Sequence, residues 1–281
     1  MPQKPLKIGT LLKQVPLQMK AGADGLMDRS GASQINPYCK HALEEAIKLK
    51  NSVPGSTLTV FSMGPPFFEQ SMKEAISMGA DESVLLSDRK LAGSDTMATA
   101  KAVARLIQTH AGDRPYDILF AGLQSVDGDT AHVPAQVAER LKCNQATYVE
   151  KVELYKDGVK VQRLIERGTQ ILYLPFPCLL SITNTGNTPR GPYLKGAMLA
   201  RASKMKVYSA DMCGINPAEV GLNGSPTVVS KVKNVTSTRE LQKFDGSAER
   251  QIKSFFSALE EMVAKKDAPA KDAPAEEVES S

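Results

Sequence analysis

The stretch Asp117-Ile-Leu-Phe-Ala-Gly-Leu-Gln-Ser-Val-Asp-Gly-Asp-Thr130 passes from a short apolar run into a polar turn. A helical pattern follows it and extends to Leu141. A short, uninterrupted apolar run is typical of a strand that is buried in a parallel sheet. This stretch therefore predicts one strand–loop–helix unit of an α/β fold, with the polar turn at the carboxyl end of the strand.

The same succession of strand and helix occurs three more times before this stretch. The expected strands are 6–12, 57–61 and 83–86, and the expected helices are 36–49, 68–78 and 94–110. Strands and helices that alternate at this spacing predict a doubly wound, mostly parallel sheet with helices on both faces.

The first of these helices has a clear expected start. Asn is a good N-cap and Pro is tolerated at the first helical position, so Asn36 and Pro37 are expected to open it. The apolar residues recur near a period of 3.6, which leaves Glu44, Glu45 and Lys48 on the side that is expected to face solvent.

The pattern changes after residue 146. Four closely spaced strand candidates follow, at 147–154, 160–166, 169–174 and 178–183, and Asp157-Gly158 is a hairpin turn signal. We expect these to extend the sheet with antiparallel strands. Beyond Thr183 glycine and proline accumulate, so we expect an extended C-terminal arm with little regular structure before an amphipathic helix at about 250–265.

The expected organisation has three parts. Residues 1–189 are expected to form an α/β domain, and residues 190–265 an extended arm and a helix. Residues 266–281 contain a repeated Lys-Asp-Ala-Pro-Ala and no packing residues, which predicts a disordered tail.

Composition excludes several classes of protein. The 281 residues carry a net charge of only +4, with basic and acidic residues interleaved, which argues against a nucleic-acid binder. The four cysteines form no close pair, so neither a metal site nor a disulfide framework is expected. The chain shows no signal peptide and no apolar run long enough for a membrane span, so a cytoplasmic protein with free thiols is expected.

The turn 122–130 is the best candidate for a binding site, because ligands of open parallel sheets bind at the carboxyl ends of the strands. Free N–H groups at the following helix start, near Asp129-Thr130, would suit a phosphate, and Gly128 permits a close backbone approach. The alternative is a plain helix cap by Asp127 or Asp129. Ser94-Asp95-Thr96 is a second polar helix start with the same two interpretations, and neither stretch is a G-x-G-x-x-G or Walker motif.

No catalytic residue is predicted. His41, His110 and His132 are expected to be ordinary solvated or capping histidines, since none has a nearby nucleophile with an obvious partner. Asp127 and Asp129 could act as an acid and a base, but the sequence offers no nucleophile beside them.

Seven motifs nevertheless match one family in order and spacing. They are Lys13-Gln-Val-Pro16, Ile35-Asn-Pro-Tyr38, Ala42-Leu-Glu-Glu-Ala46, Ser62-Met-Gly-Pro65, Met78-Gly-Ala-Asp81, Gly93-Ser-Asp-Thr96 and Asp127-Gly-Asp-Thr130. Together with positions in the later strands, such as Arg163, Glu166 and Ser181, they resemble the beta subunit of electron-transfer flavoproteins from about Leu6 to Val229.

The resemblance implies a fold like that of adenine-nucleotide α-hydrolases, without their chemistry. It also implies a heterodimer with an alpha subunit that carries a redox FAD. In one branch of the family the beta subunit holds a structural AMP, and in the bifurcating branch it holds a second FAD that takes a hydride from NADH. Carried over by position, the nucleotide site comprises Leu11, Gln14, Val15, Pro16, Asn36, Pro37, Tyr38, Cys39, Met63, Ser94, Asp95, Thr96, Gly122, Leu123, Gln124, Ser125, Val126, Asp127, Gly128, Asp129, Thr130, Ala131, His132 and Val133.

The resemblance leaves the branch and the partner open. The stretches 93–96, 127–130 and 221–227 look like the FAD-binding branch, whereas Cys39 is similar to the AMP branch and Leu17 stands where an acid usually follows Pro16. The loop 190–198 resembles the arm that grips a partner such as an acyl-CoA dehydrogenase, with Leu194 at its anchoring leucine. A nucleotide-binding regulatory module without a redox role is the alternative from another class.

Overall fold

The computed structural model describes residues 4–18, 31–229 and 242–267. The chain divides into two compact units, 1–234 and 235–281, which are described separately below. No helix among the described residues combines the length and the apolar character that a bilayer crossing needs.

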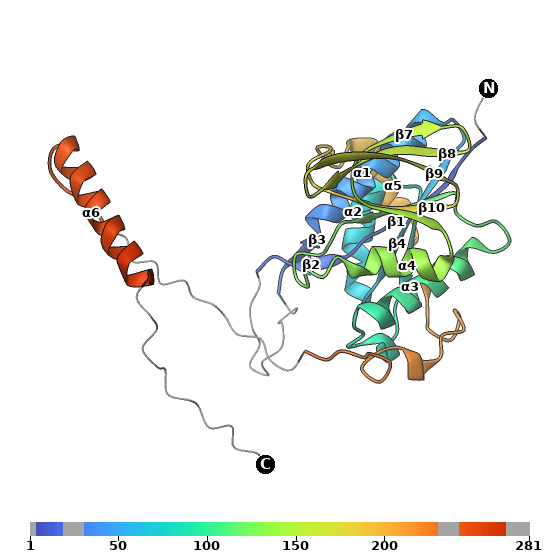
Figure 1. Ribbon diagram of the computed structural model, residues 1–281. Helices are drawn as coiled ribbons and strands as arrows, with labels where there is room; N and C mark the ends of the chain where they lie inside the picture. Colours follow the sequence, from blue (N-terminus) through green and yellow to red (C-terminus); the bar gives the residue numbers. More distant parts are fainter. Residues whose placement is uncertain (1–3, 19–30, 230–241, 268–281) are drawn as a thin grey trace, which may run out of the picture. The chain divides into compact units, whose positions relative to one another are not determined.

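A nine-stranded sheet forms the centre of the first unit (Figure 1). Its order is β11-β5-β4-β1-β6-β10-β7-β8-β9, and all pairs from β11 to β7 are parallel. The strands are β1 Lys7–Leu11, β4 Thr57–Met63, β5 Glu82–Leu86, β6 Ile118–Gly122, β7 Asn144–Tyr155, β8 Gly158–Ile165, β9 Gly168–Pro175, β10 Cys178–Ile182 and β11 Lys206–Tyr208. The predicted doubly wound, mostly parallel sheet is confirmed.

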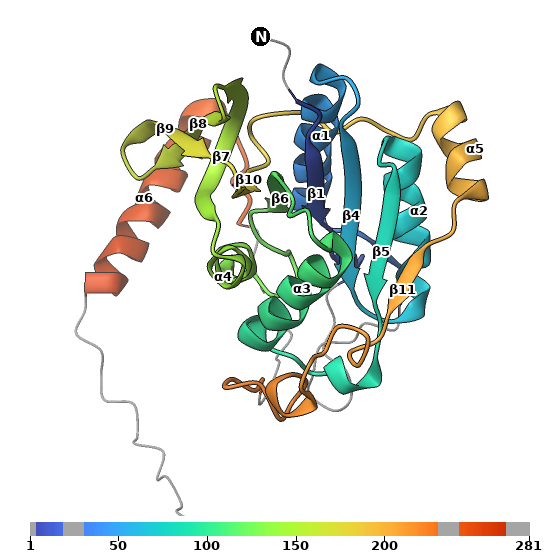
Figure 2. The same cartoon turned by 90° about the vertical axis from the view of Figure 1, so that its right-hand side faces the viewer.

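Helices cover both faces of this sheet, and each face has its own core. The helices of the first unit are α1 Pro37–Ser52, α2 Glu69–Met78, α3 Thr96–Ala111, α4 His132–Leu141 and α5 Leu194–Ala202. In Figure 2, α3 and α4 lie on the face turned towards the viewer. Within β6, Phe120 packs into the core under α1 and α2, whereas its neighbour Leu119 packs into the core under α3 and α4. The strand is thus apolar throughout because both of its faces are buried.

The second half of the sheet differs from the expectation at one strand. β7, β8 and β9 form the predicted antiparallel extension, with Tyr155 paired to Gly158 across the first hairpin. β10, however, is not antiparallel: it lies between β6 and β7 and is parallel to both. The apolar run Cys178–Ile182 is buried throughout, which is the burial pattern of a central strand.

Several short elements were not predicted. β2 Gln14–Pro16 and β3 Ser33–Ile35 pair as a separate two-stranded sheet. Single 3-10 turns occur at η1 Pro66–Phe68, η2 Arg89–Leu91 and η3 Pro217–Glu219. The segment after Thr183 is also more ordered than expected, because it contains α5 and the edge strand β11.

Two glutamates of α1 correct another expectation. Glu44 and Glu45 were expected to face solvent, but they are only 4% and 8% exposed. Their carboxylates accept hydrogen bonds from Arg190 and Asn187, which lie in the segment that joins β10 to α5. The expected outer face of α1 is therefore covered by chain that comes more than 140 residues later.

The second unit contains one described helix, α6 Ala248–Asp267. It confirms the predicted amphipathic helix and is a little longer, since it includes Lys266 and Asp267 from the expected tail. Its apolar residues Ile252, Phe255, Phe256, Leu259 and Val263 follow the spacing of one helical face. The remainder of the predicted tail, 268–281, lies outside the described residues.

Candidate functional site

The candidate site lies where the strands β1 and β6 end. Leu11, the last residue of β1, pairs with Ala121, and Gly122 at the end of β6 pairs with Ile182. The chain leaves β1 towards β4 and β5 on one side and later returns to β6 on the other, so the strand order reverses between β1 and β6. In open parallel sheets ligands bind beyond the strand ends at a reversal of this kind, and here Lys13 follows the end of β1 and the loop 122–131 follows the end of β6.

Gly122 brings this loop directly against the first turn of α1. A Cβ atom at Gly122 would lie 2.7 Å from the backbone nitrogen of Cys39 and 2.7 Å from the carbonyl carbon of Tyr38. Contacts this short are forbidden, so only glycine allows the end of β6 to approach the helix so closely. The predicted site residues at the end of β6 and those in the first turn of α1 are therefore in contact.

Asn36 joins the same two segments through its side chain. Its Nδ2 donates to the carbonyl of Gln124 at 2.7 Å, and its Oδ1 accepts from the N–H of Val126 at 3.2 Å. Asn36 stands at the N-cap position of α1, yet its side chain makes no capping hydrogen bond. The predicted cap role of Asn36 is therefore wrong: its amide is used to shape the loop.

The two carboxylates of the loop are both engaged. Lys13 Nζ donates to Asp127 Oδ1 at 2.6 Å and to Ser125 Oγ at 3.1 Å. The side-chain amide of Gln124 donates to Asp129. Lys13 was not among the predicted site residues. Its position directly after β1, opposite an acidic turn, is the signal that could have identified it.

The first residue of α4 differs from the one that was predicted. The helix begins at His132 rather than near Asp129-Thr130, and among the described residues no side chain caps it. Ala131, and not Asp127 or Asp129, occupies the N-cap position of α4. Asp129 and Ala131 both adopt positive φ, at 53° and 56°, which is an uncommon conformation for residues other than glycine. The first N–H groups of α4 lie at the positive end of the helix dipole.

The other predicted site residues surround this centre. Leu11, Met63 and Val133 are half-buried against the core under α3 and α4, and Leu123 is buried. Gln14, Val15 and Pro16 form β2, and Gln14 Oε1 accepts a hydrogen bond from Ser71. Burial raises the pKa of the Cys39 thiol, with hydrogen bonds such as that from Asn36 opposing it, so this cysteine is held as the neutral thiol.

Ser94, Asp95 and Thr96 have contacts of their own. Asp95 caps α3 by accepting from the N–H of Ala98, and its other oxygen accepts from Thr227. Ser94 Oγ accepts from the N–H of Gly221. Thr96 faces α4, where its hydroxyl accepts from Gln136 at 3.5 Å. This helix start thus secures the segment 221–227 beside α3, and cofactor binding by these three residues stays a prediction.

The three histidines differ from one another. His132 is exposed and His41 Nδ1 lies 2.8 Å from Asn187 Oδ1. His110 was expected to be solvated or to cap a helix, and this expectation is wrong. Its Nε2 lies 3.1 Å from Glu82 Oε2, and its Nδ1 lies 2.9 Å from the hydroxyl of Tyr116. Burial lowers the pKa of His110, and the charge of Glu82 opposes this only in part.

Leu194 lies away from the nucleotide-site candidates. It is the first residue of α5, not part of a loop as predicted, and it is 82% exposed. α5 is attached to the end of α2, where Tyr193 N–H donates to the carbonyl of Ser77. Ser77 lies close to the start of β5, so α5 is near the edge where the strands begin, whereas the loop 122–131 lies where they end.

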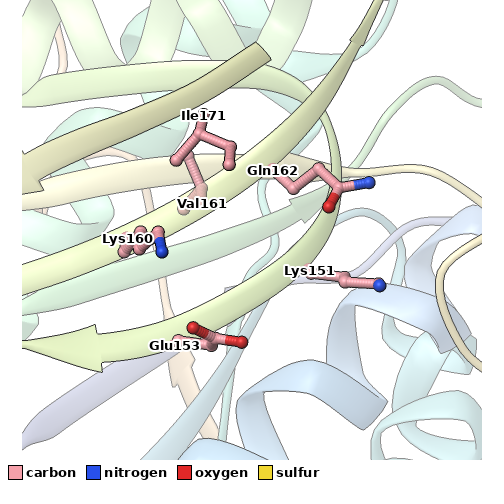
Figure 3. A pocket seen from close by; sticks show the side chains of 6 residues that line it. All are labelled: Lys151, Glu153, Lys160, Val161, Gln162 and Ile171. Carbon is pink, nitrogen blue, oxygen red and sulfur yellow. The ribbon is translucent and has the colours of Figure 1, made fainter. Parts of the chain in front are cut away.

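A separate shallow hollow occurs on the antiparallel extension (Figure 3). Its lining comes only from β7, β8 and β9, and consists of Lys151, Glu153, Lys160, Val161, Gln162 and Ile171. None of these residues belongs to the predicted site.

Comparison with known proteins now adds to this geometry. Residues 24–212 match the family model described as the electron transfer flavoprotein domain. The chain belongs to the electron transfer flavoprotein family. It is 40% identical to the electron transfer flavoprotein subunit beta of Thermoanaerobacterium thermosaccharolyticum, over 90% of this chain and 98% of that protein.

Two further relatives have other names. Protein FixA of Azotobacter vinelandii is 39% identical, over 79% of this chain and 81% of its own length. The caffeyl-CoA reductase-Etf complex subunit CarD of Acetobacterium woodii is 37% identical, over 80% and 86%. As an electron transfer flavoprotein of the beta type, the chain acts in electron transfer.

Proposed function

We propose that this electron transfer flavoprotein beta chain binds FAD in the crevice between β1 and β6. With an alpha subunit that carries a second FAD, it would pass electrons between NADH or an acyl-CoA-type dehydrogenase and that second flavin. Flavin-based bifurcation of the electrons from NADH belongs to the same proposal. The supporting observation is the uncapped start of α4 beside a loop that Asn36 and Lys13 hold in place.

The residues present fit the phosphates of an adenine cofactor. N–H groups at a helix start are anion donors, and α4 offers them without a competing side-chain cap. The acidic character of the loop is offset, because Asp127 is paired with Lys13 and Asp129 accepts from Gln124. Within the described part of the chain, a Cβ atom at Gly128 would meet Ser125 Oγ alone, at 3.5 Å, so the packing of these residues leaves room for a ligand.

FAD, when bound, supplies the ring system that accepts a hydride and passes on electrons. The protein's task is then to bind and orient the cofactor. Backbone N–H groups of 130–133 would hold the phosphates, Asn36 would keep the loop in register, and Pro16 and Pro37 would border the ring with apolar surface. No side chain of the site is required as a general base.

The test is the nucleotide content of the purified heterodimer. We expect two FAD molecules per heterodimer, measured by absorbance and by chromatography of the extracted nucleotides. One FAD and one AMP would instead identify a single-flavin carrier in which this chain is a scaffold. The absence of any adenine nucleotide besides the alpha subunit's FAD would contradict both forms of the proposal.

The partner dehydrogenase is proposed to dock at α5. Leu194 is 82% exposed and Met198, one helical turn later, is 67% exposed, which makes an apolar pair on the surface. The name of the relative CarD places that protein in a complex with a caffeyl-CoA reductase, which supports a CoA-ester reductase or dehydrogenase as the partner class.

Leu194→Ala tests this docking site. We expect the KM for the heterodimer in a dehydrogenase assay to rise about tenfold while flavin content stays unchanged, because truncation of an exposed anchor removes apolar contact area alone. Met212→Ala is the control, since Met212 is exposed and lies outside both α5 and the predicted nucleotide site. Loss of flavin in the Leu194 variant would place this residue in the subunit interface instead.

A further inference from the structure

The segment that presents Leu194 has little apolar packing of its own. From Thr183 to Pro192 the chain runs from the end of β10 across the outer side of α1 to the start of α5 (Figure 2). Its residues 184–192 are polar, glycine or proline. This connecting segment is therefore held by polar contacts along its path, whereas α5 itself packs on α2 through Gly196 and Ala200.

The strongest of these contacts joins Arg190 to Glu44. Arg190 Nε donates to Glu44 Oε2 at 2.8 Å and its Nη2 donates to Oε1 at 2.9 Å, while its backbone N–H donates to Oε2 at 3.1 Å. A fork of two parallel bonds fixes direction as well as distance. The third bond, from the backbone, ties the main chain itself to α1.

A second contact lies three residues earlier. Asn187 Nδ2 donates to Glu45 Oε1 at 2.8 Å and to the carbonyl of His41 at 3.0 Å, and its Oδ1 lies 2.8 Å from His41 Nδ1. Neighbouring side chains of α1 therefore hold the segment at Asn187 and at Arg190. Three residues after Arg190, Tyr193 N–H donates to Ser77 and α5 begins.

Burial shows that this contact is more than a surface ion pair. The side chain of Glu44 is 6% exposed, and burial alone would raise its pKa. The hydrogen bonds and the charge of Arg190 outweigh burial and hold the pKa below its ordinary value, so the carboxylate stays ionised. Only the carboxylate is buried, because the side chain of Arg190 is 37% exposed. An ion pair with a buried member adds little net stability compared with apolar residues, and its best-attested use is to select one arrangement of the chain.

We propose that Glu44 is a positioning residue for partner docking: by holding Arg190 on α1 it fixes the start of α5 and orients Leu194 and Met198 towards the dehydrogenase. The inference rests on the proposed docking at α5. It assigns to α1 a second role, since the first turn of the same helix already contacts the candidate nucleotide loop at Gly122.

The test uses the complete heterodimer and an acyl-CoA dehydrogenase that reduces the wild-type protein. Glu44→Gln keeps the size of the side chain but removes its charge and one acceptor for the fork. We expect the KM for the heterodimer to rise five- to tenfold with kcat and flavin content unchanged. Glu69→Gln is the matched control, because Glu69 is an exposed glutamate of α2 that, within the described part of the chain, forms its ion pair with Lys73.

Two further variants keep the proposal falsifiable. Arg190→Lys retains the charge but not the fork, and it replaces Glu44→Gln if that protein does not assemble; we expect the same rise in KM. The double variant E44Q/R190Q should show no higher KM than either single variant, because both substitutions remove the same contact.

The outcomes separate this inference from the proposed function. If Leu194→Ala raises KM but Glu44→Gln and Arg190→Lys do not, the positioning role is wrong and the docking site stands. If none of the three variants changes KM, docking at α5 is wrong and the inference fails with it. A fall in kcat or in flavin content without a change in KM would assign Glu44 a structural role only.

Discussion

Asn36 shows how one side chain can shape a binding loop. Its amide bonds to Gln124 and Val126, which lie 88 and 90 residues away in sequence, and it is 1% exposed. Because each buried hydrogen bond contributes about 0.5–1.5 kcal/mol, the loss of both should release the loop from α1.

The substitution Asn36→Ala tests this role. We expect it to lower the adenine-nucleotide content of the purified heterodimer at least several-fold, as measured by extraction and chromatography. Asn51→Ala is the control, since Asn51 is exposed near the other end of the same helix. Full nucleotide content in Asn36→Ala would show that the loop does not need this contact.

The roles of Asn36 and Glu44 illustrate what the sequence could not predict at the scale of a residue. Helical period and capping preference are local, and they correctly placed both residues in α1 or at its start. The partners of both side chains are supplied by segments that are distant in sequence. Local rules therefore identified the helix, but not which of its polar residues are buried.

His110 predicts a dependence of stability on pH. In the folded chain its pKa is lowered from 6.5 by burial, so below pH 6.5 the unfolded chain binds more protons than the folded one. The free energy of unfolding should therefore decrease as the pH falls from 6.5 towards the folded-state value. Glu82 and Tyr116 face the imidazole, and Lys206 forms an ion pair with the same Glu82.

Denaturant unfolding of the wild type and of His110→Gln at several pH values measures this effect. We expect the variant to be less stable above pH 6.5, by about 1–3 kcal/mol, because Glu82 and Tyr116 lose a buried partner. Its stability should also change less between pH 6.5 and the folded-state pKa. His132→Gln, at an exposed site, should retain the wild-type slope; equal slopes in all three proteins would contradict the assignment.

At the scale of an element, α5 was not predicted because its sequence gives conflicting signals. Gly191 and Pro192 precede it and Gly196 lies within it, and glycine is unfavourable inside a helix. The structure explains Gly196: a Cβ atom there would lie 2.2 Å from the carbonyl oxygen of Ser77. The close contact between α5 and α2 therefore requires glycine at position 196, and helix propensity, which is a local property, cannot predict this.

Gly196→Ala should therefore displace α5 even though alanine is the better helix former. We expect a lower free energy of unfolding, by about 1–3 kcal/mol as for other overpacked sites, together with a higher KM for the heterodimer in the dehydrogenase assay. Gly191→Ala is the matched control, because a Cβ atom at that position meets nothing within 4 Å. Similar behaviour of the two variants would show that α5 does not depend on this close approach.

α6 has an apolar face whose side chains are exposed in the described structure. Ile252, Phe255, Phe256, Leu259 and Val263 share one face of the helix, and the two phenylalanine rings lie 5.6 Å apart. We assign this face to the alpha subunit, in keeping with the expected role of residues 190–265.

Substitution of Phe255 and Phe256 by serine tests the assignment. We expect the yield of heterodimer in co-purification to fall by at least fivefold, because two large apolar side chains are lost from one contact. Exchange of the polar residues Gln251 and Lys253 for serine is the control and should leave the yield unchanged. An unaffected heterodimer in the first variant would mean that α6 is not part of the subunit interface.

For the whole molecule, the class of fold was predictable and the order of strands was only partly so. Each strand–helix repeat up to Leu141 is visible in local periodicity, and the carboxyl edge with the loop 122–131 follows from it. The position of β10 could not be derived in this way. Its sequence shows that it is buried, but its neighbours β6 and β7 are determined by the packing of the whole sheet.

The place of β10 has a consequence for how the chain is made. β6 and β7 are synthesised first, and both must wait with an open edge until the ribosome has released residue 182, after the complete β7–β9 meander. An unpaired edge is a template for association with other chains. Nascent chains that have emerged from the ribosome only as far as residues 150 to 177 should therefore be the most dependent on chaperones, and the emergence of β10 ends this exposure of both edges.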